Sequence, residues 1–144
     1  MSRIYFASYE DVAEKVRALA LEANVFLSED MKRTLAEARE SEKMPLAKSL
    51  FGEIILNAEL AAEKNMPICQ DCGLAVIFAE IGQDLHILGG DVEDALNEGV
   101  RRAYRDGYLR KSVVTDPLAE RKNSGDNTPA VIHWRIVPGH SLKI

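Results

Sequence analysis

The chain of 144 residues is long enough for one domain with its own core, since 47% of its residues are hydrophobic and 28% are charged. A net charge of -5 and a pI near 5.2 argue against a nucleic-acid partner, because basic charge supplies most of the affinity for phosphate backbones. No apolar run approaches the roughly 18 residues of a membrane span, and the first residues lack the apolar core of a signal peptide. We therefore expect a cytoplasmic protein that binds a small molecule or another protein, with no nucleic-acid or membrane partner.

Three helices are predicted over residues 8–64. Apolar residues recur at spacings of three and four behind Ser8, which can cap the first helix as the start of an S-x-x-D box. Ser28 opens the second helix, whose apolar face is thin. Pro45 fits the first turn of the third helix, which ends at Asn65 before a methionine and a proline. This part of the chain offers helices but no candidate chemistry.

Strands are predicted further along the chain. Residues 74–81 form a run between two glycines that is apolar except for Glu80, and residues 85–88 follow after a three-residue connection, which indicates a hairpin or a pair of strands. Asp91 caps another helix, which ends near Gly107. The pattern therefore changes from helices alone to strands mixed with one helix.

The last part of the chain combines a long polar loop with one clear strand. Residues 108–130 are dense in Asp, Asn, Ser, Gly and Pro, and so long a polar loop in a compact domain is usually functional or disordered. Residues 131–137 predict a strand, and a Pro-Gly turn follows. The five remaining residues look like the start of a hairpin's second strand, so we expect the N-terminal piece of something longer; a short terminal edge strand is the alternative.

Together these elements predict an α/β fold in an α+β arrangement, with N-terminal helices followed by a small mixed sheet. We expect residues 1–144 to form one N-terminal domain, with a helical part over residues 8–64 and a part of strands, helix and loop over residues 65–144. Thiols stay reduced in the cytoplasm, so a metal, catalytic or packing role for the two cysteines is favoured over a disulfide.

Both cysteines, Cys69 and Cys72, lie in the stretch MPICQDCG. A redox C-x-x-C pair places its reactive cysteine at a helix N-terminus, whereas this pair follows a helix and leads into a strand. Structural zinc requires four ligands, and the three histidines of the chain are not paired at ligand spacing. One cysteine could instead belong to an iron-sulfur cluster whose other ligands lie elsewhere. On residue types alone, an unligated structural pair is favoured.

The sequence around the cysteines resembles a known family. MPICQDCGLAVIF, residues 66–78, resembles the P-x-C-Q-D-T-G signature of the iron-sulfur-dependent class I fumarases and the related L-tartrate dehydratases. YLRKS at residues 108–112, then DPL, then NSGDNTPA at residues 123–130 resemble the L-R-x-S and N-T-G-D/T-N-x-P-A elements of that family, in the same order. The chain looks most like the N-terminal part of the alpha subunit of the two-subunit enzymes. This resemblance implies a beta subunit or C-terminal domain as partner, in an oligomer.

The resemblance implies a hydro-lyase that reversibly hydrates a small dicarboxylate, either fumarate to malate or the tartrate counterpart. Cys69 matches a ligand of a [4Fe-4S] cluster, whose open iron acts as a Lewis acid on the substrate hydroxyl. Gln70 matches a substrate-contacting glutamine, and Asp71 matches a general acid or proton relay. Arg110 matches an arginine that binds a substrate carboxylate. On the residues alone, Asp71 would instead be a turn residue that caps its own backbone before Gly73.

The loop at residues 123–130 is interpreted as shaping the pocket, with Asn123 and Asp126 as candidate substrate-binding residues; an ordinary turn is the alternative. Cys72 departs from the family, which usually has threonine there, and nothing in the motif makes it a ligand. The family cluster requires three cysteines, so we expect that this chain alone neither holds the cluster nor catalyses the reaction. The alternatives are a metal-free interaction domain that binds through its long loop, and a small C-x-x-C thiol redox protein.

Overall fold

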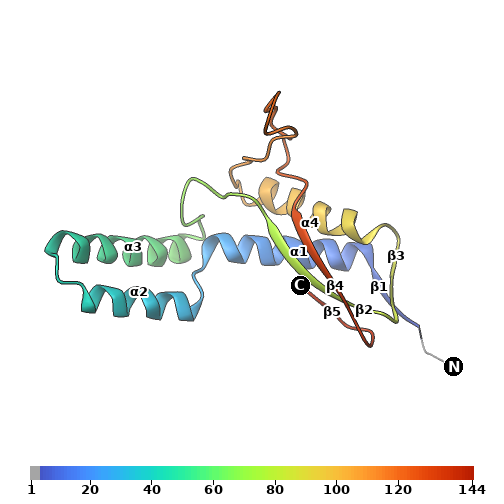
Figure 1. Ribbon diagram of the computed structural model, residues 1–144, viewed down its shortest axis with the longest axis horizontal. Helices are drawn as coiled ribbons and strands as arrows, with labels where there is room; N and C mark the ends of the chain where they lie inside the picture. The colour runs from blue at the N-terminus through green and yellow to red at the C-terminus, as the bar shows by residue number, and fades with distance from the viewer. Residues whose placement is uncertain (1–3) are drawn as a thin grey trace. The chain divides into compact units, whose positions relative to one another are not determined.

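The computed structural model describes residues 4–144. The chain forms two compact units, one from the residues up to Leu21 together with Asp71–Ile144, and the other from Glu22–Gln70. In chain order the elements labelled in Figure 1 are β1 (Tyr5–Ser8), α1 (Tyr9–Val25), α2 (Glu29–Ser41), α3 (Pro45–Lys64), β2 (Val76–Gly82), β3 (Leu85–Leu88), α4 (Val92–Asp106), β4 (Val131–Val137) and β5 (Leu142–Lys143). Apart from β1, the predicted order of helices followed by small mixed sheets is confirmed. None of the helices in residues 4–144 has the length and apolar character needed to cross a bilayer.

The helical unit is built mainly on α2 and α3, which pack against each other (Figure 1). Ser28 occupies the N-cap position of α2, as predicted, although its side chain makes no capping hydrogen bond. Pro45 is the first residue of α3, a position at which a backbone N–H has no hydrogen-bond partner within the helix, so the N–H that proline lacks is not needed. Asn65 ends α3 in the left-handed conformation with a φ of 51°. Both predicted ends of α3 are therefore confirmed.

Much of the apolar side predicted for α3 is exposed. Leu46, Leu50 and Ile54, which follow one another at four-residue spacing, are 71%, 50% and 47% exposed. The buried residues of α3 are Ala58 and Ala61, near its C-terminal end. The apolar periodicity therefore identifies the helix but not which of its residues are covered.

β2 is the central strand of a three-stranded sheet with the order β4-β2-β5 (Figure 1). β4 runs parallel to β2, starting with Val76 opposite Val131, and β5 pairs antiparallel with β2 at Ile81 opposite Leu142. β1 and β3 form a separate parallel pair. A hairpin of β2 with β3, one of the two predicted arrangements, is wrong because β4 and β5 occupy both edges of β2 and β3 pairs with β1.

The connection from β4 to β5 crosses the end of β2. The backbone N–H of Gly82 donates to the carbonyl of Ser141 at 2.8 Å. A Cβ on Gly82 would lie 2.7 Å from the carbonyl carbon of Gly139 and 2.7 Å from the Cα of His140, so only glycine fits there. The last residues therefore pair with β2 as a short edge strand and not with β4 as a hairpin.

The strand β1 is absent from the sequence prediction. It has only four residues, and it pairs with β3, which lies about 80 residues further along the chain, from Tyr5 opposite Leu85 to Ser8 opposite Leu88. Directly before the helix-start signal at Ser8, a strand of four residues is too short to show a periodic pattern.

Both N-terminal caps predicted for the helices of the larger unit are present. The Ser8 hydroxyl oxygen accepts a hydrogen bond from the Asp11 N–H at 3.0 Å, and the Asp91 carboxylate accepts one from the Asp94 N–H at 3.0 Å. α4 ends at Gly107, as predicted. These local signals set where α1 and α4 begin, and therefore which of their residues face the sheet.

The core of the larger unit lies between β2 and the helices α1 and α4. Ile77 and Ala79 of β2 are buried against residues of both helices. The helical residues of this core are Val12 and Val16 from α1, and Ala95, Leu96, Val100, Ala103 and Tyr104 from α4. The ring of Tyr104 thus belongs to the core, and the hydroxyl lies at the tip of the side chain.

Ion pairs also join α1 to α4. Arg102 donates to both carboxylate oxygens of Glu10, and Arg17 donates to Asp106 at 2.8 Å. The hydrogen bond from Arg102 lowers the pKa of Glu10. Because these side chains are partly or largely exposed, the pairs contribute little, and packing between the helices determines how they meet.

Gly99 of α4 packs tightly against α1, so replacing it with alanine is expected to destabilise the unit by about 2 kcal/mol. A Cβ there would lie 2.5 Å from the Cβ of Val16 and 2.6 Å from the carbonyl oxygen of Ala13, and neither atom can move without shifting α1. This overlap outweighs the gain of about 1 kcal/mol from the better helix propensity of alanine. Urea unfolding of the purified chain measures the change.

The matched control is Gly52→Ala in α3. A Cβ at Gly52 would meet the Arg39 guanidinium at 3.5 Å, an ordinary contact, so this variant is expected to be neutral or more stable. Equal stability of the Gly99→Ala and wild-type chains would contradict the close packing of α1 on α4.

Candidate functional site

Asp71, Cys72 and Gly73 form a turn that leads into β2, in the larger unit. The Tyr104 hydroxyl donates to the carbonyl of Cys72 at 2.8 Å and lies 3.2 Å from the carbonyl of Gly73. Gly73 has a φ of 60°, which glycine adopts without strain. The Gly73 N–H donates to Oδ1 of Asp71 at 3.3 Å, the capping contact expected of a turn aspartate. The turn is therefore held from α4 as well as by its own side chain.

The segment that follows α4 comes back to this turn. Leu109 is buried in the core, and the next residue, Arg110, donates its backbone N–H to the Cys72 sulfur at 3.2 Å. The Ser112 hydroxyl donates to Oδ1 of Asp71 at 3.4 Å. The Arg110 side chain is exposed and is in no ion pair with any described residue. Two of the sequence motifs therefore meet, with the guanidinium open to solvent.

Asn127 brings the third motif to the same place. Its side chain is fully buried. Its Oδ1 accepts hydrogen bonds from the backbone N–H groups of Ser112 at 2.7 Å and Val113 at 3.0 Å, and its Nδ2 donates to the carbonyl of Gly73 at 3.1 Å. One side chain thus links all three segments. We call the residues 71–73, 109–113 and 123–128 the motif cluster.

Asn123 and Asp126, two of the predicted substrate-binding residues, bond within the motif cluster. The amide of Asn123 donates to the carbonyl of Lys111 at 2.8 Å and accepts from the Gly125 N–H at 2.7 Å. Asp126 accepts from the backbone N–H of Thr128 at 3.0 Å and from its hydroxyl at 2.8 Å. Both side chains therefore shape the loop from within.

Two groups of the motif cluster and its surroundings have shifted pKa values. Burial raises the pKa of the Tyr104 phenol, and the nearby Cys72 and Asp71 raise it further, so the hydroxyl remains a donor at neutral pH. Burial of Asp126 would raise its pKa, but the hydrogen bonds from Thr128 outweigh burial and hold the pKa below its ordinary range. Asp126 is therefore an ionised acceptor.

Cys69 and Gln70 belong to the helical unit, where both are exposed. The residue before them, Ile68, donates its N–H to the carbonyl of Asn24 at 2.9 Å and accepts at its own carbonyl from the Asn57 side chain at 2.7 Å. The chain is thus held within the helical unit up to Ile68, directly before the predicted ligand. No described helix begins at either cysteine, whereas a redox C-x-x-C pair has its reactive cysteine at a helix N-terminus.

The described residues do not provide a complete metal site. Over residues 4–144 there is no group of three His, Cys, Asp or Glu side chains placed to share one ion. The sequence holds two cysteines in all, fewer than the three thiolates that the family resemblance implies for its cluster. This chain by itself therefore does not fit the whole group.

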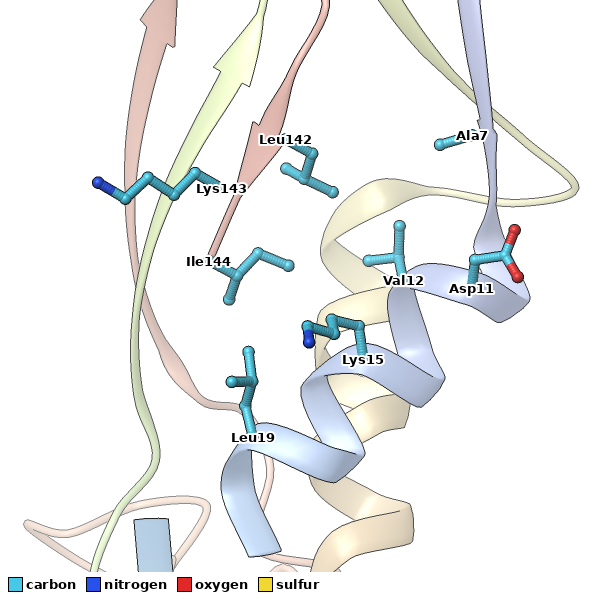
Figure 2. A pocket seen from close by; sticks show the side chains of 8 residues that line it. All are labelled: Ala7, Asp11, Val12, Lys15, Leu19, Leu142, Lys143 and Ile144. Atoms are coloured by element: carbon cyan, nitrogen blue, oxygen red, sulfur yellow. The ribbon is translucent and has the colours of Figure 1, made fainter. Parts of the chain in front are cut away.

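A cavity of about 390 Å³ lies elsewhere in the larger unit, between α1 and the last residues of the chain (Figure 2). Leu142 and Ile144 point to the side of α1, Leu142 toward Val12 and Ile144 over Leu19, while Lys143 points the other way, as alternation along a strand requires (Figure 2). None of the predicted site residues lines this cavity. Its walls combine apolar side chains with the charged Asp11, Lys15 and Lys143, and they include no residue of the motifs.

Sequence reasoning did not single out Tyr104, Ser112 or Asn127. Tyr104 fits the pattern as one more apolar position of a helix, and its contact with Gly73 joins residues 31 apart in the chain. Ser112 and Asn127 lie within the motifs YLRKS and NSGDNTPA, so the resemblance to the family could have drawn attention to them. Nothing in their spacing shows that Asn127 would be buried between the other two segments.

Comparison with known proteins places this sequence in a family. The model of the fumarate hydratase family matches residues 13–144. A Methanocaldococcus jannaschii protein named for the alpha subunit of L(+)-tartrate dehydratase is 32% identical over 125 residues, which cover 83% of this chain and 43% of the relative. The anaerobic class I fumarate hydratase of Escherichia coli K12 is 36% identical over 92 residues, 63% of this chain and 17% of the relative.

A third relative, fumarate hydratase 2 of Leishmania major, is 37% identical over 87 residues, 60% of this chain and 15% of the relative. The chain therefore spans less than half the length of each of these relatives. The family match covers all three motifs and all the predicted site residues. The resemblance inferred from the motifs is thus confirmed, and the chain belongs to the family of class I fumarate hydratases and L-tartrate dehydratase alpha subunits.

Proposed function

We propose that this chain is the N-terminal domain of the alpha subunit of a hydro-lyase that reversibly adds water to a dicarboxylate, either fumarate or its tartrate counterpart. The observation that carries the proposal is the motif cluster, in which three motifs far apart in sequence are joined by the buried Asn127. We propose that a beta subunit or C-terminal domain completes the site in a cytoplasmic oligomer, as the relatives named as alpha subunits suggest.

Arg110 is proposed to bind a substrate carboxylate. Its backbone is held by the contact of its N–H with the Cys72 sulfur, and it follows the buried Leu109. Its guanidinium is exposed and in no ion pair with another described residue, so it is available to an anion. A planar fork binds a carboxylate through two parallel hydrogen bonds and so orients it.

Asp71 is proposed as the general acid or proton relay for the hydroxyl that leaves or adds. The contacts of its Oδ1 with the Gly73 N–H and the Ser112 hydroxyl orient the carboxyl group. In dehydration a proton passes from the carboxyl group to the departing hydroxyl, which leaves as water as the C–O bond breaks, while a base from the rest of the enzyme takes the proton of the adjacent carbon so that the double bond forms; hydration reverses both transfers. Gln70 directly precedes Asp71 in the chain and is proposed to contact the substrate through its amide, which can donate and accept.

Asn123 and Asp126 are proposed to support the substrate pocket from within its loop. Cys69 is proposed as one thiolate ligand of a [4Fe-4S] cluster in the complete enzyme. Because the two cysteines of this chain are too few for that cluster, the remaining ligands would come from the rest of the enzyme. The roles proposed for Arg110, Asp71 and Gln70 concern only side chains of this chain.

The proposal is tested with the complete enzyme, assembled anaerobically, by measuring hydration of fumarate and dehydration of tartrate. Arg110→Lys keeps the charge but loses the fork, so we expect KM to rise about 10- to 100-fold, since a hydrogen bond to a charged group contributes roughly 1.5–3 kcal/mol. The matched control is Arg121→Gln, an exposed arginine of the same loop, which should leave KM unchanged. An assembled enzyme that acts on neither substrate, or equal KM values for both variants, would refute the proposal.

A further inference from the structure

We propose that Asn127 is a positioning residue for this reaction, because its side chain holds the segment that carries Asp71 and the segment that carries Arg110 in one arrangement. The proposal deepens the proposed function and rests on it for its catalytic readout. Its structural readout stands independently.

The two ends of the Asn127 amide bond to different segments. Oδ1 accepts from the N–H groups of Ser112 and Val113 at 2.7 and 3.0 Å, and Nδ2 donates to the carbonyl of Gly73 at 3.1 Å. Two donors and one acceptor determine which end of the amide is oxygen and which is nitrogen. The side chain thus replaces a direct backbone contact between the two segments.

The Asn127 side of these bonds is out of contact with water. Asn127 is fully buried, so removing its amide would leave the Ser112 and Val113 N–H groups without this acceptor, while the Gly73 carbonyl would keep its contact with the Tyr104 hydroxyl. Asn127 also adopts a φ of 67°, which asparagine tolerates better than most residues. The residue type is therefore suited both to the backbone and to the bonds.

The bonded groups are close in sequence to the proposed functional residues. Gly73 lies two positions after Asp71, and Ser112 lies two positions after Arg110. A change in the spacing of Gly73 and Ser112 would therefore move the proton-transfer group relative to the carboxylate-binding group. A displacement of about 1 Å between such groups can lower the rate by as much as 100-fold.

Two variants separate the two ends of the amide. Asn127→Asp keeps an oxygen for the Ser112 and Val113 amides but loses the donor to Gly73, and places a carboxylate against that carbonyl. Asn127→Gly removes both ends, and glycine accepts the φ of 67° without strain. The matched control is Asn97→Asp, a buried asparagine of α4 that accepts from the Ala130 N–H at 2.8 Å and donates to the Glu93 carbonyl at 3.1 Å, outside the segments of Asp71 and Arg110.

The structural readout is hydrogen–deuterium exchange of the Ser112 and Val113 amides in this chain. We expect exchange to accelerate at least tenfold in Asn127→Gly and to stay near wild type in Asn127→Asp and Asn97→Asp. The catalytic readout is kcat and KM in the assembled enzyme. Asn127→Asp is expected to lower kcat about 10- to 100-fold with little change in KM, Asn127→Gly to change both, and Asn97→Asp to change neither.

Unchanged amide exchange in Asn127→Gly would overturn the proposal, and so would kcat and KM values that are as unchanged in both Asn127 variants as in Asn97→Asp. If the wild-type assembly hydrates no dicarboxylate, the proposed function fails, whereas the exchange rates still decide whether Asn127 joins the two segments.

Discussion

Replacing Asp71 with asparagine is expected to lower kcat of the assembled enzyme by about 10²- to 10⁴-fold, the usual effect of losing a general acid or base. Asparagine keeps an oxygen in the place of Oδ1, so it can still accept from the Gly73 N–H and the Ser112 hydroxyl. The turn is therefore preserved while the exchangeable proton is lost. Steady-state assays with fumarate and with tartrate measure the effect.

The same substitution distinguishes the two interpretations of Asp71. If Asp71 only caps the turn before Gly73, the asparagine of Asp71→Asn would restore that contact, and the variant would retain activity near wild type. Asp71→Ala, which cannot accept either hydrogen bond, provides the comparison: it should lose stability as well as activity. Thermal unfolding of both variants shows whether the turn has been disturbed.

The second large effect is expected at Cys69. Cys69→Ser in the anaerobically assembled enzyme should abolish activity and lower the bound iron, because a serine hydroxyl is a much poorer ligand for iron-sulfur clusters than a thiolate. Iron content and the visible absorption of the cluster are measured beside activity. Loss of activity with a full cluster would show that Cys69 is not a ligand.

Cys72→Ser is the matched control for this experiment. The Cys72 sulfur accepts from the Arg110 N–H at 3.2 Å, and a serine oxygen can accept the same hydrogen bond. We therefore expect its activity to remain within about threefold of wild type and its iron content to be unchanged. If neither substitution changes activity or iron content, the cluster is not part of the proposed function. If both lower them equally, Cys72 is a ligand as well.

Local signals predicted most of the secondary structure. Asp91 caps α4 and Pro45 opens α3, as their sequence positions indicate, and β4 spans the predicted residues. Strand pairing was not predictable in the same way, because the neighbours of β2 are chosen by burial across the whole unit. The run at residues 74–81 shows a buried strand but carries no information about whether β3 or β4 lies beside it.

The motifs predicted the candidate site better than composition did. Asp71 and Arg110 were identified by resemblance, and the contact between the Cys72 sulfur and the Arg110 N–H places their segments together. Tyr104 could not be identified from the sequence, because a buried tyrosine on a helix differs from any core residue only by a hydroxyl whose partners lie 31 and 32 residues away.

The parallel pairing of β2 with β4 has a consequence for synthesis on the ribosome. Glu80 and Arg135, partners across the two strands, are 55 residues apart in the chain. At roughly 5–20 residues per second, β2 would wait about 3 to 11 seconds for its neighbour to be made. During that time the apolar residues of β2 are unpaired, whereas α2 and α3 are already complete. We therefore expect the nascent larger unit to depend on chaperones until β4 has emerged.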